Sequence, residues 1–479
     1  MSLTFADLFE FISGVRLAPG AANTPLGEFV VDSREVRTGD VFVALAGERV
    51  DGADYVPAAF ERGAQLAVVA DARRDVLARV KAQELRSDSL PYGNGAFVWF
   101  VPDPLVVLQQ FATWWRNRYI GRVVGVTGSV GKTTTKELIA QVLGVRGPVL
   151  KTAGNRNNAI GVPLTLLRMT ERHRFSVLEM GMDRLGEIEM YCQWARPHIG
   201  VVTLIGPVHL EKLGSMENIA LAKSELIRAL PPAAEGGVAV LNADDPRVVA
   251  MASLTHARVL LYGLASNADV RATDITSHGL DGVSFRLHYG AASLPVHLKL
   301  LGRHSVHTAL SAAAVALSQG YQMEEVVQGL GDEPTQLRLV VAHGPYGSLV
   351  LDDCYNASPE STIAALNLLE DIDGDMPRIA VLGDMLELGD AEQPGHEEVG
   401  CRAALVADLI VCVGERSRHT ARAARECGAA ADAVQHVADN MEAVALLRKK
   451  VNERSVILVK GSRGMHMEEI VAALGGFDD

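Results

Sequence analysis

Residues 127–133 have the composition of a phosphate-binding loop. They read Thr127-Gly128-Ser129-Val130-Gly131-Lys132-Thr133, and Thr134 is next in the chain. Glycine reaches backbone conformations that other residues avoid, so Gly128 and Gly131 allow successive N–H groups to converge on an anion at the start of a helix. Lys132 supplies a mobile positive charge for the outer phosphates, and the hydroxyl of Thr133 can ligate Mg²⁺. The loop predicts binding of a nucleoside triphosphate; the alternative is an ordinary glycine-rich turn.

The elements on either side of the loop fit this prediction. Residues 122–126 form a short apolar run that predicts a buried strand, and residues 132–143 place Leu138 and Val142 on one face of a helix. The usual spacing G-x-x-x-x-G-K-[ST] is incomplete, because Val126 occupies the position of its first glycine. The order of strand, loop and helix supports the site nevertheless.

Three further side chains could act on a bound triphosphate. Glu179 ends the apolar strand FSVLEMG, where a carboxylate can hold Mg²⁺ unless it serves only as a cap or a surface residue. His209 follows the next predicted strand, residues 199–205, and should reach the same sheet edge, although a lone histidine is as often structural. Lys223 lies in the middle of a predicted helix, where a solvated lysine is the simpler expectation.

Polar loops at other predicted strand ends are candidates for substrate binding. The loop with Asn155 and Asn158 is rich in amides and could bind a polar substrate or form only a turn. The loop with Ser33 and Arg34, and the turn from Gly47 to Gly52, lie where ligand contacts collect in α/β folds; the alternative is two polar turns.

Three polar clusters each follow a predicted strand in the last third of the chain. They are residues 352–356 with Asp353 and Asn356, residues 383–389, and residues 460–463 with Lys460, Ser462 and Arg463. Because the carboxyl ends of parallel strands share one sheet edge, we expect a second half of the binding site there.

The bulk composition limits the classes of function. The chain has 479 residues, 45 basic and 58 acidic, and a net charge of −13, so we expect no nucleic-acid partner. Five cysteines without a C-x-x-C pair predict neither a disulfide framework nor a zinc site. Acidic residues stand where a secretory signal would be basic, and no apolar run reaches about 18 residues, so we expect a cytoplasmic protein without stable membrane insertion.

Length and alternating strand and helix patterns predict an α/β protein of three domains, at about 150 residues each. We expect a small α/β domain at residues 1–100, and a central domain at 101–331 whose mostly parallel P-loop sheet is flanked by helices. A doubly wound, Rossmann-like domain should follow at 332–479. Within the central domain, residues 266–300 read as short and less regular β runs.

The motifs, taken in order over the whole chain, resemble those of the Mur ligase family. They are TGSVGKT, the Asn-rich turn, VLEMG, the histidine after the next strand, AKSE around Lys223, NADDP at 242–246, LDDCYNASPES, GDMLELG and KGSR. The last three resemble the branch that joins D-alanyl-D-alanine to UDP-N-acetylmuramoyl-tripeptide, and the DNPR signature of the member that adds the third peptide residue is absent. The resemblance implies an ATP- and Mg²⁺-dependent amide ligase of peptidoglycan synthesis, and we expect a monomer.

The resemblance also implies roles for single residues of the central domain. Lys132 would bind the β- and γ-phosphates of ATP, and Thr133 would ligate one Mg²⁺. Glu179 and His209 would hold a second Mg²⁺. Lys223 would correspond to the lysine that is carbamylated in related ligases, where the carbamate positions that metal.

For the outer domains, the resemblance places the UDP-sugar against Ser33, Arg34 and the turn at residues 47–52. Arg338, Asp353 and the cluster at residues 460–463 would close over ATP and the acceptor dipeptide, with a hinge at residues 333–338. These roles require the third domain to move toward the central one.

Two departures from the family pattern concern the base pocket and the hinge. Ser305 and Thr308 stand where the adenine-side pattern R-H-N-x-x-N has asparagines, and Leu337 replaces the glycine before the hinge arginine. Three alternatives stay open: a folylpolyglutamate synthase, which shares the central domain but lacks a UDP-binding one; a P-loop motor or signalling ATPase; and a non-catalytic binding protein.

Overall fold

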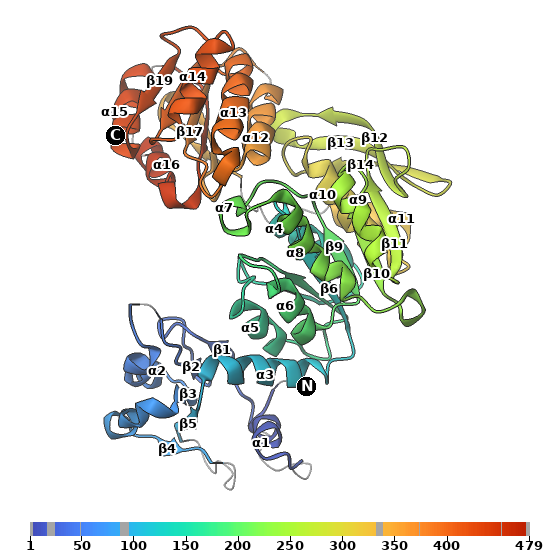
Figure 1. Ribbon diagram of the computed structural model, residues 1–479, viewed down its shortest axis with the longest axis vertical. Helices are drawn as coiled ribbons and strands as arrows, with labels where there is room; N and C mark the ends of the chain where they lie inside the picture. Colours follow the sequence, from blue (N-terminus) through green and yellow to red (C-terminus); the bar gives the residue numbers. More distant parts are fainter. Residues whose placement is uncertain are drawn as a thin grey trace. The chain divides into compact units, whose positions relative to one another are not determined.

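The computed structural model describes residues 3–16, 24–47, 49–86, 95–331, 339–372, 374–451 and 453–475 (Figure 1). The described residues form three β-sheets flanked by helices, which confirms the predicted α/β class. The chain divides into two compact units. Unit 1 comprises Met1–Val124, Gly147–Met180 and Glu189–Pro197, and unit 2 comprises Gly125–Arg146, Gly181–Ile188 and His198–Asp479.

The first sheet is parallel, with the strand order β1-β2-β3-β5-β4. Its strands are β1 (Phe29–Val30), β2 (Val41–Val43), β3 (Leu66–Ala70), β4 (Gln83–Glu84) and β5 (Phe97–Val101). The nearby helices are α1 (Phe5–Ser13), η1 (Gly52–Tyr55), α2 (Val56–Glu61), η2 (Asp71–Arg79) and α3 (Pro104–Arg116). Short apolar strands such as β3, buried over four of its five residues, build the core of this part of unit 1.

The second sheet has the order β14-β13-β12-β11-β10-β9-β6-β8-β7. Its strands are β6 (Arg122–Thr127), β7 (Val149–Lys151), β8 (Phe175–Glu179), β9 (Ile199–Val202), β10 (Val238–Asn242), β11 (Arg258–Gly263), β12 (Val270–Ser277), β13 (Val283–Tyr289) and β14 (Ala292–Leu298). Its helices are α4 (Lys132–Gly144), α5 (Gly161–Leu167), α6 (Glu187–Ala195), α7 (Leu210–Leu213), α8 (Met216–Arg228), η3 (Ala233–Glu235), α9 (Pro246–Ala250), η4 (Met251–Leu254), η5 (Gly279–Asp281), α10 (Ser305–Ser318) and α11 (Met323–Gly331).

The third sheet has the order β15-β16-β20-β17-β18-β19, and all its pairs are parallel except β15 with β16. Its strands are β15 (Val340–His343), β16 (Leu349–Asp353), β17 (Arg378–Gly383), β18 (Leu409–Val413), β19 (Val434–Val437) and β20 (Val456–Lys460). Its helices are η6 (Pro345–Gly347), α12 (Pro359–Asp371), η7 (Gly389–Ala391), α13 (Glu392–Val406), α14 (Arg418–Glu426), α15 (Asn440–Lys450), η8 (Arg463–Met465) and α16 (Glu468–Gly475).

Two separate cores cover the faces of the third sheet. One core contains buried residues of α12, α13 and α14, and the other contains those of α15 and α16. Figure 1 shows these two groups of helices at the orange and red end of the chain, around β17. This is the doubly wound arrangement that the alternating pattern predicts.

The helices that carry site residues begin and pack as their sequences dictate. Helix α4 starts immediately after Gly131 and buries Leu138 and Val142 almost completely, which confirms the predicted apolar face. Helix α8 is capped by Ser215, whose hydroxyl accepts from the Asn218 N–H at 3.1 Å. Its buried face includes Lys223, so the expected solvated lysine is wrong for this position.

The stretch that reads as irregular β runs is a regular extension of the second sheet. Strands β12, β13 and β14 pair antiparallel in succession, and β12 pairs parallel with β11. A register shift between Thr273 and Thr276 interrupts β12, and this break in the alternation explains why the pattern looks irregular. Among the described residues, no helix combines the length and apolar character that crossing a membrane requires.

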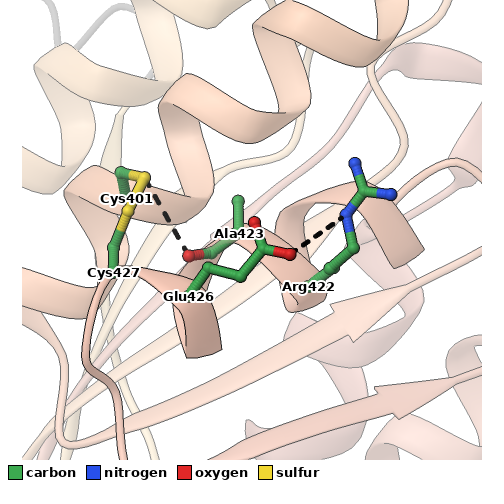
Figure 2. Close-up of a disulfide and its surroundings, with 5 residues drawn as sticks. All are labelled: Cys401, Arg422, Ala423, Glu426 and Cys427. Atoms are coloured by element: carbon green, nitrogen blue, oxygen red, sulfur yellow. Dashed lines mark hydrogen bonds and ion pairs between the residues drawn. A yellow bond between two sulfur atoms is a disulfide. The ribbon is translucent and has the colours of Figure 1, made fainter.

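One cysteine pair departs from the expectation drawn from the sequence. Cys401 of α13 and Cys427, which follows α14, form a disulfide with a Cα–Cα distance of 5.2 Å (Figure 2). Cys192, Cys354 and Cys412 are free and buried. The sequence, with five cysteines and no characteristic spacing, did not reveal this pair. The two cysteines meet because α13 and α14 pack side by side, which the spacing of cysteines does not show.

The disulfide predicts a countable thiol change. Protein unfolded without reductant should show three titratable thiols, and five after reduction. Because the bridge closes a loop with a sequence separation of 26, reduction should lower the free energy of unfolding by about 3 kcal/mol. Thiol titration in denaturant and denaturant melts with and without reductant measure both quantities. Five thiols before reduction would show that the bond does not form.

Candidate functional site

The loop after β6 has the backbone of an anion-binding turn. Gly128 and Gly131 have φ values of 145° and 83°, a region that favours glycine. A Cβ at Gly128 would lie 1.8 Å from the Thr203 Oγ1, so even alanine does not fit there. Gly131 directly precedes the first turn of α4, so the amide groups of that turn face the loop.

The loop is fastened to the segment that leaves β9. The Ser129 N–H donates to the Leu204 carbonyl at 2.8 Å, and the Ser129 hydroxyl donates to the Gly206 carbonyl at 2.9 Å. The Thr203 hydroxyl donates to the Val130 carbonyl at 2.6 Å. These bonds hold the loop rigidly against the strand end that leads to His209.

The amine of Lys132 folds back over the loop. It donates to the carbonyls of Gly128 at 2.8 Å and Ser129 at 3.1 Å. An ammonium group beside a glycine-bearing loop at the start of a helix is the arrangement that binds phosphate oxygens. The sequence prediction for Lys132 and its loop therefore has matching geometry.

His209 lies at the start of α7 in a left-handed conformation, with φ of 60°. Its Nδ1 is 2.6 Å from Glu387 Oε2 and 3.6 Å from Asp183 Oδ1. Lys212 pairs with Asp183 at 3.0 Å and lies 3.5 Å from Glu387 Oε1. Burial lowers the pKa of His209 and outweighs the two carboxylates, while Lys132 lowers the pKa further.

Lys223 is 3% exposed and, among the described residues, has no hydrogen-bond or ion-pair partner for its amine. Burial lowers the pKa of Lys223 well below the ordinary lysine value, and the positive charge of Lys132 lowers it further. This shift favours the uncharged amine, which is the nucleophilic form.

A cavity of about 540 Å³ in unit 2 adjoins the phosphate loop. Residues from the second and third sheets line it, among them Ser129 and Thr134 of the loop region, Tyr262, and Asp353 and Lys460 of the third sheet. Its size suits a nucleotide. The cavity brings the predicted first and second halves of the site together.

The polar clusters of the third sheet are linked to one another. The Lys460 amine, 2% exposed, is 2.5 Å from Asp353 Oδ2 and donates to the Asn356 carbonyl at 3.0 Å. The Ser462 hydroxyl accepts from the Leu386 N–H at 2.8 Å. Three strand ends thus form one network, as their common sheet edge predicts.

Arg463 lies apart from this network. Its guanidinium is exposed and pairs with Glu468 at 3.1 Å. The residues therefore do not act as one cluster over 460–463, and only Lys460 of the predicted group lines the cavity.

Both positions that depart from the adenine-side pattern, Ser305 and Thr308, line the cavity. The Ser305 hydroxyl at the start of α10 also donates to the Leu301 carbonyl, four residues earlier in the chain, at 2.6 Å. His307 contacts Asp244 through Nε2 at 2.8 Å, and His304 also lines the cavity. Enclosure by protein lowers the pKa of His304, which favours the neutral form of its imidazole.

Glu179 belongs to unit 1, at the buried end of β8. Its Oε1 accepts from the Asn157 side-chain amide at 2.8 Å, and its N–H donates to the Thr152 hydroxyl at 3.0 Å. Full burial excludes the alternative of a surface residue. Sequence reasoning missed Asn157, although it lies in the amide-rich loop.

The remaining predicted residues of unit 1 lie on polar turns. Arg34 is exposed and pairs with Asp32 at 2.6 Å, and Ser33 lies between them. The Gly47 N–H donates to the Val50 carbonyl at 2.9 Å. These positions fit surface ligand sites as well as simple turns.

The amide-rich loop is partly structural. The Asn158 side chain accepts from the Gly161 N–H at 2.9 Å and so shapes the start of α5. Asn155 lies three residues earlier in the same loop. Arg338 and the predicted hinge at residues 333–338 lie outside the described residues.

Several site residues could not be identified from the sequence alone. Asp183 and Glu387 contact His209, and Tyr262 and His307 line the cavity. The signal for Glu387 was present, since it lies in the GDMLELG cluster. Across the described ranges, no three His, Cys, Asp or Glu side chains gather into a complete metal-ligand set.

Fold and site together define a nucleotide-dependent α/β enzyme with a P-loop and a second binding surface on a doubly wound domain. The chain matches family models described as Mur ligase family, catalytic domain at residues 29–112, Mur ligase middle domain at 126–316, and Mur ligase, glutamate ligase domain at 337–463. The chain belongs to the Mur ligase family.

Relatives with known names support this assignment. The chain is 36% identical over 475 residues to the UDP-N-acetylmuramoyl-tripeptide--D-alanyl-D-alanine ligase of Bacillus subtilis, covering 98% of each. It is also similar to a crystal structure of MurF from Acinetobacter baumannii, with TM-score 0.80, 30% identity and 98% of each chain covered. A MurF ligase from Thermotoga maritima in complex with ADP matches at TM-score 0.75 and 27% identity, covering 94% and 97% of the two chains.

The position of Lys132 predicts a selective loss of activity. Lys132→Ala should leave folding intact and lower ATP-dependent turnover at least about 100-fold, because the loop loses its only side-chain charge for phosphate. Steady-state phosphate release and a thermal melt measure the two effects. Lys449→Ala, an exposed lysine on α15, serves as the control. Turnover in Lys132→Ala equal to that of the control would contradict the assignment.

Proposed function

We propose that this chain joins D-alanyl-D-alanine to UDP-N-acetylmuramoyl-tripeptide with hydrolysis of ATP, which gives the pentapeptide precursor of peptidoglycan. The observation that carries the proposal is the shared cavity, whose lining includes the phosphate loop and the Asp353–Lys460 pair. The named relative, matched over 98% of the chain, supports the choice of substrates. Its match includes the first 100 residues, the region that a folylpolyglutamate synthase would lack.

The donor carboxylate must be activated before an amine can attack it, because its leaving group would otherwise be oxide. The donor carboxylate attacks the γ-phosphorus of ATP, ADP leaves, and an acyl phosphate forms. Lys132 and the loop amides stabilise the charge that spreads over the phosphoryl oxygens. The amine of the dipeptide then attacks the acyl carbon, loses a proton, and phosphate departs from the tetrahedral intermediate as the amide forms.

Water must be kept from the acyl phosphate. The cavity is bounded by elements of both the second and the third sheet, so closure of these elements over the substrates would exclude solvent. Lys460 and Asp353 are placed to orient groups that enter from the third sheet. No nucleophile from the protein is required.

The residues fit Mg²⁺ as an additional component. Thr133 follows Lys132 in the loop of unit 2, and His209 of the same unit keeps Nε2 free of hydrogen bonds among the described residues. Mg²⁺ keeps several waters and phosphate oxygens in its shell, so a full set of protein ligands is not needed. When bound, the ion would neutralise phosphate charge.

We further propose that Lys223 is carbamylated. A buried amine with a strongly lowered pKa and no partner is ready to add to CO₂, and the product is an anion. The carbamate would lie near Lys132, whose positive charge now disfavours a second cation. The modification would therefore place a negative charge beside the positive charge of Lys132, which is a favourable pair.

We also propose that the protein is a monomer that acts in the cytoplasm, where ATP and UDP-linked substrates are available. Size-exclusion chromatography with light scattering tests the first part. A mass of about one chain is the expected result.

The function is tested by reconstitution. The protein is mixed with ATP, Mg²⁺, D-alanyl-D-alanine and each UDP-muramoyl tripeptide, ending in lysine or diaminopimelate. Phosphate release should require both the tripeptide and the dipeptide, and mass spectrometry should show the pentapeptide. Phosphate release without the dipeptide would instead indicate an ATPase of another kind.

Lys223 predicts chemical rescue. Lys223→Ala should lower ligation about 100-fold or more, because the anion at this position is lost. Short carboxylates such as acetate or formate should restore part of the activity in the variant and none in the wild type. Full activity of Lys223→Ala without added carboxylate would refute the carbamate.

A further inference from the structure

We propose that Glu387 is a positioning residue that sets the tautomer of His209, so that the imidazole presents a free Nε2 to the metal only when the 383–389 loop lies against α7. This inference deepens the proposed function and rests on it. Glu387 lies 178 residues beyond His209, in the loop that follows β17 of the third sheet.

The contact between the two residues is short and directional. His209 Nδ1 and Glu387 Oε2 are 2.6 Å apart, which is a hydrogen-bond distance for a charge-assisted pair. A carboxylate only accepts, so Nδ1 must carry the proton and donate it. Nε2 then keeps its lone pair, the form in which histidine ligates metal.

Of the two carboxylates near His209 Nδ1, Glu387 rather than Asp183 is its hydrogen-bond partner. Asp183 Oδ1 is 3.6 Å from the same Nδ1, beyond hydrogen-bond distance, and its other oxygen pairs with Lys212 at 3.0 Å. Lys212 also lies 3.5 Å from Glu387 Oε1 and partly balances its charge. One carboxylate therefore orients the imidazole, and the other holds the lysine.

The backbone on both sides is built for this contact. His209 and Glu387 have φ values of 60° and 64°, a conformation that side-chain-bearing residues adopt only where their surroundings hold them. The Glu211 N–H reaches the Glu387 carbonyl at 3.4 Å, so backbone and side chain dock together. The loop packs closely on α7, since a Cβ added at Gly389 would lie only 3.4 Å from the Glu211 backbone.

The arrangement couples two events that the ligation needs at the same time. Docking of the third-sheet loop on α7 brings the carboxylate, and the carboxylate fixes the histidine for the metal. An undocked loop leaves His209 free to adopt either tautomer. The metal site would thus be completed only when the acceptor-binding sheet is in place.

The first readout is the tautomer itself. With ¹⁵N-labelled histidine, the His209 signal is assigned by its loss in His209→Gln and followed at neutral pH with a non-hydrolysable ATP analogue. The wild type should show the Nδ1–H form. Glu387→Ala should show the Nε2–H form or a mixture. A wild-type Nε2–H signal would overturn the proposal, whatever the activity of the enzyme.

The second readout is affinity for Mn²⁺ as a spectroscopic substitute for Mg²⁺. With the same analogue present, Glu387→Ala should weaken Mn²⁺ binding about 10–100-fold by electron paramagnetic resonance. Glu387→Gln should lie between the variant and the wild type, since its amide oxygen still accepts from Nδ1. Unchanged Mn²⁺ affinity in Glu387→Ala would contradict the proposal.

Glu392→Ala is the matched control. Glu392 begins α13, five residues later, and forms an ion pair with Arg416 at 3.0 Å. It should leave both readouts unchanged, and thermal melts confirm that all variants are folded. A defect in reconstituted ligation with a normal tautomer and normal Mn²⁺ affinity in the wild type would count against the proposed function and leave the role of Glu387 intact.

Discussion

The structure depends on the attachment of the phosphate loop to the end of β9. Ser129 bonds to Leu204 and Gly206, and Thr203 bonds to Val130, so loop and strand end move as one body. The closeness of Thr203 leaves no room for a side chain at position 128 of the loop. Because the chain continues from this strand end to α7, the same bonds that shape the anion site also place the histidine beside it.

The proximity of two lysines, Lys132 and Lys223, is the second feature of the site. Lys223 is buried, and Lys132 lowers the pKa of both Lys223 and His209. A positive charge on Lys223 would be repelled by that of Lys132. Under the proposed function, the triphosphate and a carbamate on Lys223 would both add negative charge beside Lys132.

Residues of the second and third sheets together line the cavity that adjoins the phosphate loop. The His209–Glu387 bond is a further link between elements of these two sheets. The Lys460–Asp353 pair is almost fully buried on the lysine side, which fixes the third-sheet wall. Binding and closure can therefore be linked through a few polar bonds whose geometry is defined by rigid strand ends.

The sequence by itself determined the α/β class, the P-loop, and the central elements of each sheet, because strong periodicity and glycine spacing are local signals. It also placed Lys132, Glu179, His209 and Lys460 at strand or helix ends. It predicted short β runs over residues 266–300 but not their regular antiparallel pairing, because a register shift in β12 breaks the alternation.

Only the tertiary structure showed which side chains contact one another. Glu387 meets His209 across 178 residues, Asn157 binds Glu179, Lys223 is buried on α8, and Cys401 pairs with Cys427. Each of these facts depends on which helix or loop packs beside which. The periodicity of a sequence shows which residues share one face of a helix or strand. The burial of a side chain, its pKa and its bonding partner depend on the other elements that the fold packs against that face.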